Sequence, residues 1–225
     1  PAMTYIANNA FLGCTDLTTV DAPYITSVGD RAFSGCINLT SVTMPLVTYV
    51  GDNTFRDCSL TSVNMPSLTT VDSLAFVNCH DLISVVLPNL TSLGGSCFKS
   101  CTNLINVDMP LLTSIGNRAF NLCGSLNSFN APGQLVLPTS LTSIGEQSFQ
   151  HCTDLRGNLF IPSSVTSVGS EAFYQCTGFF PTPVVANSTV TTIASDSFSG
   201  CCTTTREPSG QPTGEPSGQP SAKPS

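Results

Sequence analysis

The stretch AFSGCINLTSV, residues 32–42, decides the fold because its pattern recurs along the chain. Similar stretches occupy residues 10–20, 75–85 and 97–107. Each holds a phenylalanine three residues before a cysteine, and an aliphatic residue lies five positions before each phenylalanine. The phenylalanines of this column recur every 21–29 residues and are Phe11, Phe33, Phe55, Phe76, Phe98, Phe120, Phe149, Phe173 and Phe198. These nine aligned units indicate a repeat architecture.

Each unit is interpreted as two short extended pieces and one tight helical turn. The piece at 39–45 ends in proline, which cannot donate to a β-ladder. The piece at 47–51 ends in a glycine, a position that most units share and that is expected to permit a sharp turn. The segment 29–36 is long enough for one or two helical turns. No unit can bury its apolar side alone, so stacking into an α/β solenoid of short strands and short helical turns is expected.

The full pattern, A-F-x-x-C-x-x-L-x-x-V-x-x-P-x-x-V-x-x-I-G, resembles the BspA-like, or Treponema pallidum-type, leucine-rich repeat family. The resemblance covers residues 3–202 and implies a right-handed curved solenoid used at cell surfaces for adhesion and ligand binding. It implies no catalytic residues. We expect the repeat domain to span residues 1–202. Because the chain starts in the middle of a unit, further repeats are expected upstream.

Residues 203–225 have a different character, with prolines every four residues from Pro208 and no apolar side chain larger than alanine from Glu207 onward. Such a segment cannot bury enough apolar surface to fold, so a disordered linker is expected. It is similar to the Pro/Ser/Gly/Gln-rich linkers of stramenopile surface proteins. It can be interpreted either as a stalk that holds the solenoid away from a surface or as an unselected disordered terminus.

The composition excludes several partners. Lys and Arg total 7 against 14 acidic residues, which gives a net charge of −7. This charge disfavours nucleic acid and anionic membrane surfaces, because both attract basic patches. No apolar run reaches the length of a transmembrane helix, so direct membrane insertion of this segment is not expected.

The recurring cysteine could be a nucleophile, a metal ligand, half of a disulfide or a packing residue. The two histidines stand directly beside column cysteines, where adjacent side chains diverge, and no orienting group is evident. Paired metal-ligand spacings are also lacking, so neither a catalytic nor a metal site is expected. Buried thiols are favoured over disulfides between repeats. The predicted core column consists of Phe33, Cys36, Phe55, Cys58, Phe76, Cys79, Phe98, Cys101, Phe120 and Cys123.

Candidate ligand-binding residues lie among the positions expected to be exposed. A threonine occurs at the same position in all nine units and should form an exposed hydroxyl column. The alternative is that threonine simply suits an exposed strand. The central members of this column are Thr26, Thr48, Thr69, Thr91 and Thr113. Units six to eight carry insertions, at residues 130–141 and 177–190, which are expected to form loops on one face. Phe180 stands in the second insertion and could anchor a partner. Glycosylation sequons predict modification at Asn38, Asn89 and Asn187.

These observations predict a non-catalytic recognition or adhesion module without cofactors. Its expected partners are protein or glycan ligands on a cell surface or matrix, and its expected location is extracellular or at the cell surface. Two alternatives remain: a solenoid that binds ice or polysaccharide through the threonine column, and a purely structural spacer.

Overall fold

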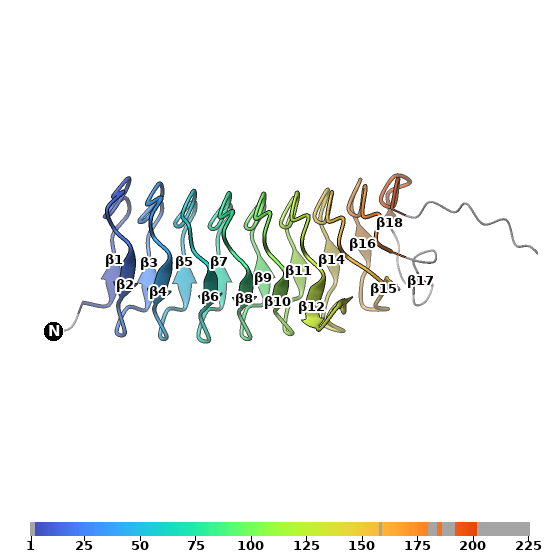
Figure 1. Cartoon of the computed structure of the whole chain (residues 1–225). Helices are drawn as coiled ribbons and strands as arrows, with labels where there is room; N and C mark the ends of the chain where they lie inside the picture. The colour runs from blue at the N-terminus through green and yellow to red at the C-terminus, as the bar shows by residue number, and fades with distance from the viewer. Residues whose placement is uncertain (1–2, 158, 180–183, 186–191, 202–225) are drawn as a thin grey trace, which may run out of the picture.

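The computed structural model describes residues 3–157, 159–179, 184–185 and 192–201. These residues form eighteen short β-strands joined by turns. Successive coils lie side by side in one elongated array (Figure 1). The expected solenoid is therefore confirmed. None of the described residues belongs to a helix that is long and apolar enough to cross a membrane.

One strand from each of nine successive coils enters a single parallel sheet, here called the long sheet. Its strands are β1 (Tyr5–Ile6), β3 (Ser27–Val28), β5 (Tyr49–Val50), β7 (Thr70–Val71), β9 (Ser92–Leu93), β11 (Ser114–Ile115), β14 (Ser143–Ile144), β16 (Ser167–Val168) and β18 (Thr192–Ile193). Equivalent residues pair from coil to coil, so Val28 lies between Ile6 and Val50. This register places every column of the repeat in a straight row along the array.

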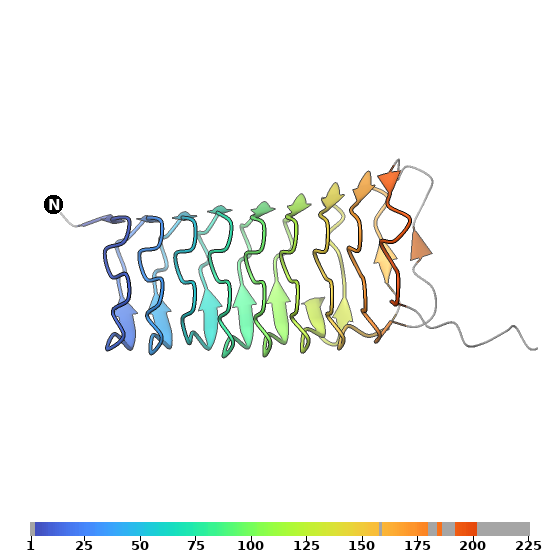
Figure 2. The same cartoon turned by 90° about the horizontal axis from the view of Figure 1, so that it is seen from above.

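The remaining strands run along a second side of the array, which Figure 2 separates from the long sheet. They are β2 (Thr19–Asp21), β4 (Ser41–Thr43), β6 (Ser62–Asn64), β8 (Ser84–Val86), β10 (Asn106–Asp108), β12 (Ser128–Ala131), β13 (Gln134–Leu135), β15 (Phe160–Ile161) and β17 (Val184–Val185). All pairs on this side are parallel except β12 and β13, which form an antiparallel hairpin. This hairpin contains part of the insertion at residues 130–141.

The prediction of short helical turns is wrong. In the segment 29–36, the N–H groups of Ala32, Ser34 and Cys36 close tight turns to carbonyls three residues back. The alternate N–H groups, of Arg31, Phe33 and Gly35, donate instead to the next coil. An α-helix satisfies its N–H groups within itself, whereas half of these connect neighbouring repeats. The segment is therefore a series of turns that belongs to the stacking.

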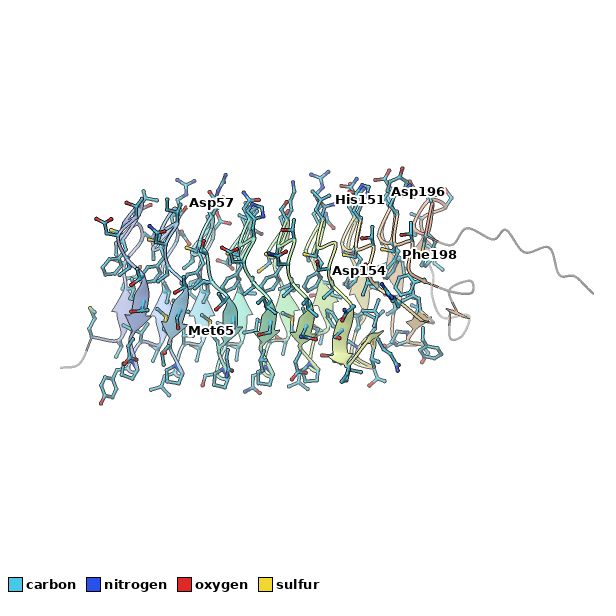
Figure 3. All side chains as sticks on the ribbon, in the orientation of Figure 1. Asp57, Met65, His151, Asp154, Asp196 and Phe198 are labelled. Carbon is cyan, nitrogen blue, oxygen red and sulfur yellow. The ribbon has the colours of Figure 1, made fainter. Side chains whose placement is uncertain are left out.

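Two positions in each of the first eight turns have a left-handed backbone, which also prevents a helix. Asp57 and His151 occupy one of them, with φ of 58° and 60°, and both lie along the turn edge of the array (Figure 3). Asn53 occupies the other with φ of 53°. Asn, Asp and Gly are common at these two positions because they tolerate this conformation best.

The recurring glycine does not serve the turn in the way expected. Gly29, Gly51 and Gly145 are not among the residues with positive φ. Instead, a Cβ on Gly145 would lie 2.6 Å from the backbone nitrogen of Asn117 in the preceding coil. A Cβ on Gly29 or Gly51 would overlap a side-chain oxygen of the preceding coil. Glycine is required here because successive coils approach each other closely.

The interior consists of columns of identical side chains. Adjacent phenylalanine rings of the column stack with centroids 5.1–5.6 Å apart and interplanar angles of 0–14°. Beside them, Cys79 Sγ donates to the carbonyl oxygen of Phe55 at 3.1 Å, and Cys101 Sγ donates to that of Phe76 at the same distance. Each thiol thus satisfies a carbonyl of the preceding coil and binds two repeats together. The ten cysteines among the described residues are free thiols.

Candidate functional site: a furrow beside the long sheet

A ladder of side-chain hydrogen bonds runs along the end of the long sheet, where each strand enters its turn. Asn8 Oδ1 accepts the backbone N–H of Asp30 at 3.0 Å, and Asp30 Oδ1 accepts that of Asp52 at 3.0 Å. Further along, Asn117 Oδ1 accepts the N–H of Glu146 at 3.0 Å. We call these three contacts the Asx ladder. Each one uses an oxygen of one coil to satisfy a backbone donor of the next.

The Asx ladder is interrupted between Asp52 and Asn117 and stops again after Glu146. Within the interruption, the ladder position holds Ser73 and Gly95, neither of which carries the amide or carboxylate of the other steps. Within the described chain, the backbone N–H groups of Ser73, Gly95 and Asn117 therefore have no acceptor. These three donors are available to water or to a ligand.

Asp72 explains why the interruption begins after Asp52. It stands where neighbouring coils have Gly51 and Gly94, and the Asx oxygen of an intact step lies where its Cβ would be. The Asp52 carboxylate is turned aside and accepts the Asn53 side-chain amide at 2.5 Å. One residue with a Cβ at the glycine position is thus incompatible with the step before it.

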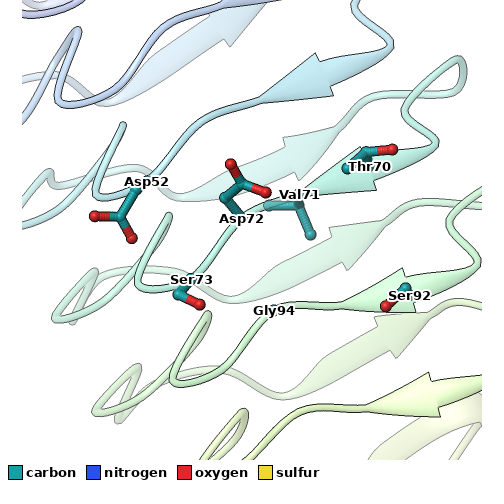
Figure 4. A pocket seen from close by; sticks show the side chains of 7 residues that line it. All are labelled: Asp52, Thr70, Val71, Asp72, Ser73, Ser92 and Gly94. Carbon is teal, nitrogen blue, oxygen red and sulfur yellow. The ribbon is translucent and has the colours of Figure 1, made fainter.

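Two hollows open where the Asx ladder is interrupted, and together we call them the furrow. The first, of about 390 Å³, lies between Asp52, Asp72 and Ser92 and has Gly94 in its wall (Figure 4). The second, of about 400 Å³, extends through Gly95, Ser96 and Asn117 to Arg118 and Glu146. Both are lined by Ser73. Small side chains at the ladder position thus leave a polar depression across successive coils.

The furrow carries more negative than positive charge. Asp52, Asp72 and Glu146 line it, whereas Arg118 is its one cation among the lining residues. Arg118 Nε already donates to Gln147 Oε1 at 2.6 Å. Tyr49 donates its hydroxyl to Asp72 Oδ2 at 2.6 Å. This hydrogen bond, together with burial and the carboxylate charge, raises the pKa of Tyr49 to about 12, so the phenol remains a donor.

The threonine column lies on the exposed surface, but most of its hydroxyl hydrogens are used within the fold. Thr26, Thr48 and Thr69 each donate to the carbonyl oxygen of the preceding threonine in the column at 3.1 Å, and Thr113 does so at 2.8 Å. Thr91 is exposed as well. Hydroxyls engaged in this way offer a ligand acceptor oxygens but few donors. This geometry gives the column a role in stacking. It weakens the alternative in which ice or polysaccharide binds through the threonine column.

The cysteines of the column are buried thiols that stay protonated. Burial raises the pKa of the thiols from Cys36 to Cys152, including that of Cys123, which rises to about 12. Cys14, in the first coil, is exposed. Among the described residues, no group of three or more His, Cys, Asp or Glu side chains could hold a metal ion.

The other predicted sites lie on separate parts of the array. Asn38 and Asn89 are exposed, and their side-chain amides donate to the carbonyl oxygens of Thr15 at 2.8 Å and Pro66 at 2.7 Å. Phe180 and Asn187 lie outside the described residues, as does the predicted linker at 203–225. The structure does not bring these positions together with the furrow.

The hairpin of β12 and β13 forms the wall of another hollow, of about 280 Å³, on the second side. Asn106, Asp108 and Ser128 line it, and Asn130 in the hairpin accepts the backbone N–H of Met109 at 2.7 Å. Further along the chain, Phe179 is buried and packs edge-on against Phe173 with centroids 6.2 Å apart. Sequence reasoning expected the insertions to matter but did not identify the furrow.

The family model described as BspA type Leucine rich repeat region matches residues 2–46, 26–136 and 133–207. The repeat, the parallel solenoid and this match agree along the whole array. The chain belongs to the BspA-type leucine-rich repeat family. A comparison with curated proteins gave no match.

Solved structures of other leucine-rich repeat proteins are similar to this BspA-type chain. A leucine-rich repeat protein from Bacteroides ovatus is 26% identical, with a TM-score of 0.72, and the match covers 88% of this chain and 50% of that protein. The leucine-rich repeat protein of Treponema pallidum is 26% identical, with a TM-score of 0.61 and coverage of 68% and 72%. A leucine-rich cell surface protein from Faecalibacterium prausnitzii is 26% identical, with a TM-score of 0.53 and coverage of 87% and 60%. The chain thus spans half the length of the Bacteroides ovatus protein.

Proposed function

We propose that the chain is a non-catalytic recognition module that works at a cell surface or after secretion and binds protein or glycan ligands. Membership of the BspA-type family supports binding as its role, because stacked repeats create extended surfaces for partners. The similar protein from Faecalibacterium prausnitzii is described as a cell surface protein, which supports the proposed location.

The furrow is the observation that carries this proposal. The interior columns repeat almost without change, whereas the Asx ladder is interrupted over adjacent coils and leaves two hollows that share Ser73 as a lining residue. Their volumes, about 390 Å³ and about 400 Å³, fall within the range of ligand sites, roughly 300–1,000 Å³. A polar depression with three open backbone donors is a place where a partner can bind.

The thiols support a role without catalysis. A cysteine nucleophile requires a thiolate, and burial raises the pKa of the column thiols instead of lowering it. Cys79 and Cys101 also use their S–H groups as donors to backbone carbonyls of the preceding coil. We therefore assign the recurring cysteines to the stability of the array.

The proposal can be tested by immobilising the full chain and measuring retention of purified extracellular-matrix proteins and of neutral and acidic oligosaccharides. Ser73→Asn/Gly95→Asn, which fills the furrow, should abolish retention of at least one ligand. Ser62→Asn is the matched control, because Ser62 is exposed on β6 away from the furrow. Failure of the wild-type chain to retain any of these ligands, or equal losses in both variants, would argue against the proposal.

A further inference from the structure

We propose that the furrow binds an extended, uncharged oligosaccharide whose hydroxyl oxygens take the place of the missing Asx oxygens. This inference rests on the proposed function and adds the class of ligand. In the intact steps, an oxygen of Asn8, Asp30 or Asn117 accepts a backbone N–H of the next coil. In the furrow the equivalent N–H groups lack that acceptor. An oxygen atom of a ligand at the same place would accept the same hydrogen bonds.

The floor of the furrow lacks the side-chain oxygen that fills the intact steps. At Gly29, Gly51 and Gly145, the atoms nearest to a built Cβ include an Asx oxygen. At Gly94 and Gly116, the three nearest atoms all belong to backbone. At these two glycines no side-chain oxygen takes the Asx position, and Gly94 lines the first hollow of the furrow.

The ligand must donate hydrogen bonds as well as accept them. The backbone N–H groups of Ser73, Gly95 and Asn117 require acceptors. The carboxylates of Asp52 and Asp72 each accept one hydrogen bond from the chain and have lone pairs left for further donors. A sugar hydroxyl is both donor and acceptor. An anionic ligand is disfavoured, because Asp52, Asp72 and Glu146 would repel it.

The spacing of the coils favours a sugar chain over a peptide. Successive coils are separated by 5.1–5.6 Å at the phenylalanine column. An extended peptide advances only about 3.3 Å per residue, so its carbonyls fall out of step with the N–H groups after one coil. One pyranose ring with its glycosidic oxygen is close to one coil in length, so each ring of an extended chain can offer a hydroxyl to one coil.

Filling the furrow offers a test that does not threaten the fold. A Cβ at Gly95 would meet its nearest atom, the carbonyl oxygen of Asn117, at 3.4 Å, and Gly95 does not have a positive φ. Asn at residues 73 and 95 would face Gly94 and Gly116, as Asn8 faces Gly29. Ser73→Asn/Gly95→Asn should therefore complete two steps of the Asx ladder, and its urea midpoint should equal or exceed that of the wild type.

The experiment is isothermal titration of the full chain with soluble glucan, xylan, mannan and chitin oligosaccharides of increasing length, and with polygalacturonate fragments as the anionic counterpart. At least one neutral series should bind, with affinity rising until the furrow is filled. Ser73→Asn/Gly95→Asn should weaken that binding at least about tenfold, because two ligand hydrogen bonds are lost. Ser62→Asn should bind like the wild type.

Two results would overturn the inference: no neutral series binds, or the folded Ser73→Asn/Gly95→Asn variant binds as well as the wild type. Preferential binding of polygalacturonate would overturn it too. The retention assay with extracellular-matrix proteins, described above, distinguishes failure of the oligosaccharide inference from failure of the proposed recognition function. If a matrix protein is retained by the wild type and lost on filling the furrow, the recognition role stands and the ligand is a protein. If neither arm shows binding, both proposals fall.

Discussion

The interior columns and the Asx ladder are built from the same repeat but follow different rules. Phenylalanine rings stack from Phe11 to Phe198 without a gap, because an unfilled position in the core would leave a cavity. The Asx ladder lies near the surface and is complete at three steps only. Water can satisfy a donor that is left open there, so the ladder can be interrupted without collapse. The comparison indicates that core packing requires the same side chain in every repeat, whereas the residues of the Asx ladder can vary from repeat to repeat and so can serve binding.

The largest expected effect is alkaline unfolding through the buried thiols. Burial raises the pKa of the column cysteines in the folded chain, whereas in the unfolded chain they ionise near their ordinary pKa of about 8.5. Above that pH the unfolded state binds fewer protons than the folded state, so the free energy of unfolding falls as pH rises. The loss is about 1.4 kcal/mol per pH unit for each thiol until its folded pKa is reached.

Urea unfolding under reducing conditions at about pH 8 and about pH 10 measures this slope. Replacing Cys79 and Cys101 together by alanine removes two of the titrating groups and should make the fall shallower. An unchanged slope in that variant would show that the column does not carry the effect.

Removing a ring from the middle of the column should cost more than removing one at its end. Phe76 is fully buried and stacks on both Phe55 and Phe98, so Phe76→Ala should lower the free energy of unfolding by about 3–5 kcal/mol. Phe11 is 39% exposed and stacks on Phe33 alone within the described chain, so Phe11→Ala should cost about half as much or less. Equal losses in urea titrations would contradict a continuous column.

A smaller effect should separate a glycine of the recurring column, Gly145, from the glycine at the ladder position, Gly95. Gly145→Ala places a Cβ 2.6 Å from the backbone nitrogen of Asn117 and should destabilise the fold by about 1–3 kcal/mol. Gly95→Ala meets nothing nearer than 3.4 Å and should be neutral or stabilise by up to about 1 kcal/mol. Thermal melting of the two variants provides the comparison. Similar costs would mean that close approach of the coils is not what requires glycine.

The period, the columns and the parallel stacking could be predicted from the sequence because they depend on apolar side chains with a fixed spacing. The turns could not be predicted in the same way. The length of each turn segment suited a helix, but half of its N–H groups donate to the next coil. The spacing of residues within one unit does not reveal these hydrogen bonds between units. A signal was present, since Asn9, Gly35, Asn53 and Asp57 are residues that tolerate a left-handed backbone.

The furrow was missed because it is defined by what two positions lack. Aligning the units shows Asn8, Asp30 and Asp52 in one column, followed by Ser73 and Gly95. That change is visible in the sequence, but its meaning depends on knowing that the Asx oxygen reaches the next coil. The threonine column misled for the opposite reason. Its regularity indicated a binding surface, whereas most of its hydroxyls donate within the stack.

Amide hydrogen exchange, followed by NMR on the full chain, tests the interruption of the Asx ladder most directly. Protection is predicted for the backbone N–H groups of Asp30, Asp52 and Glu146, which donate to Asx oxygens. Rapid exchange is predicted for the equivalent groups of Ser73, Gly95 and Asn117. In Ser73→Asn/Gly95→Asn, the N–H groups at residues 95 and 117 should become protected. Uniform protection of all six groups in the wild type would contradict the account.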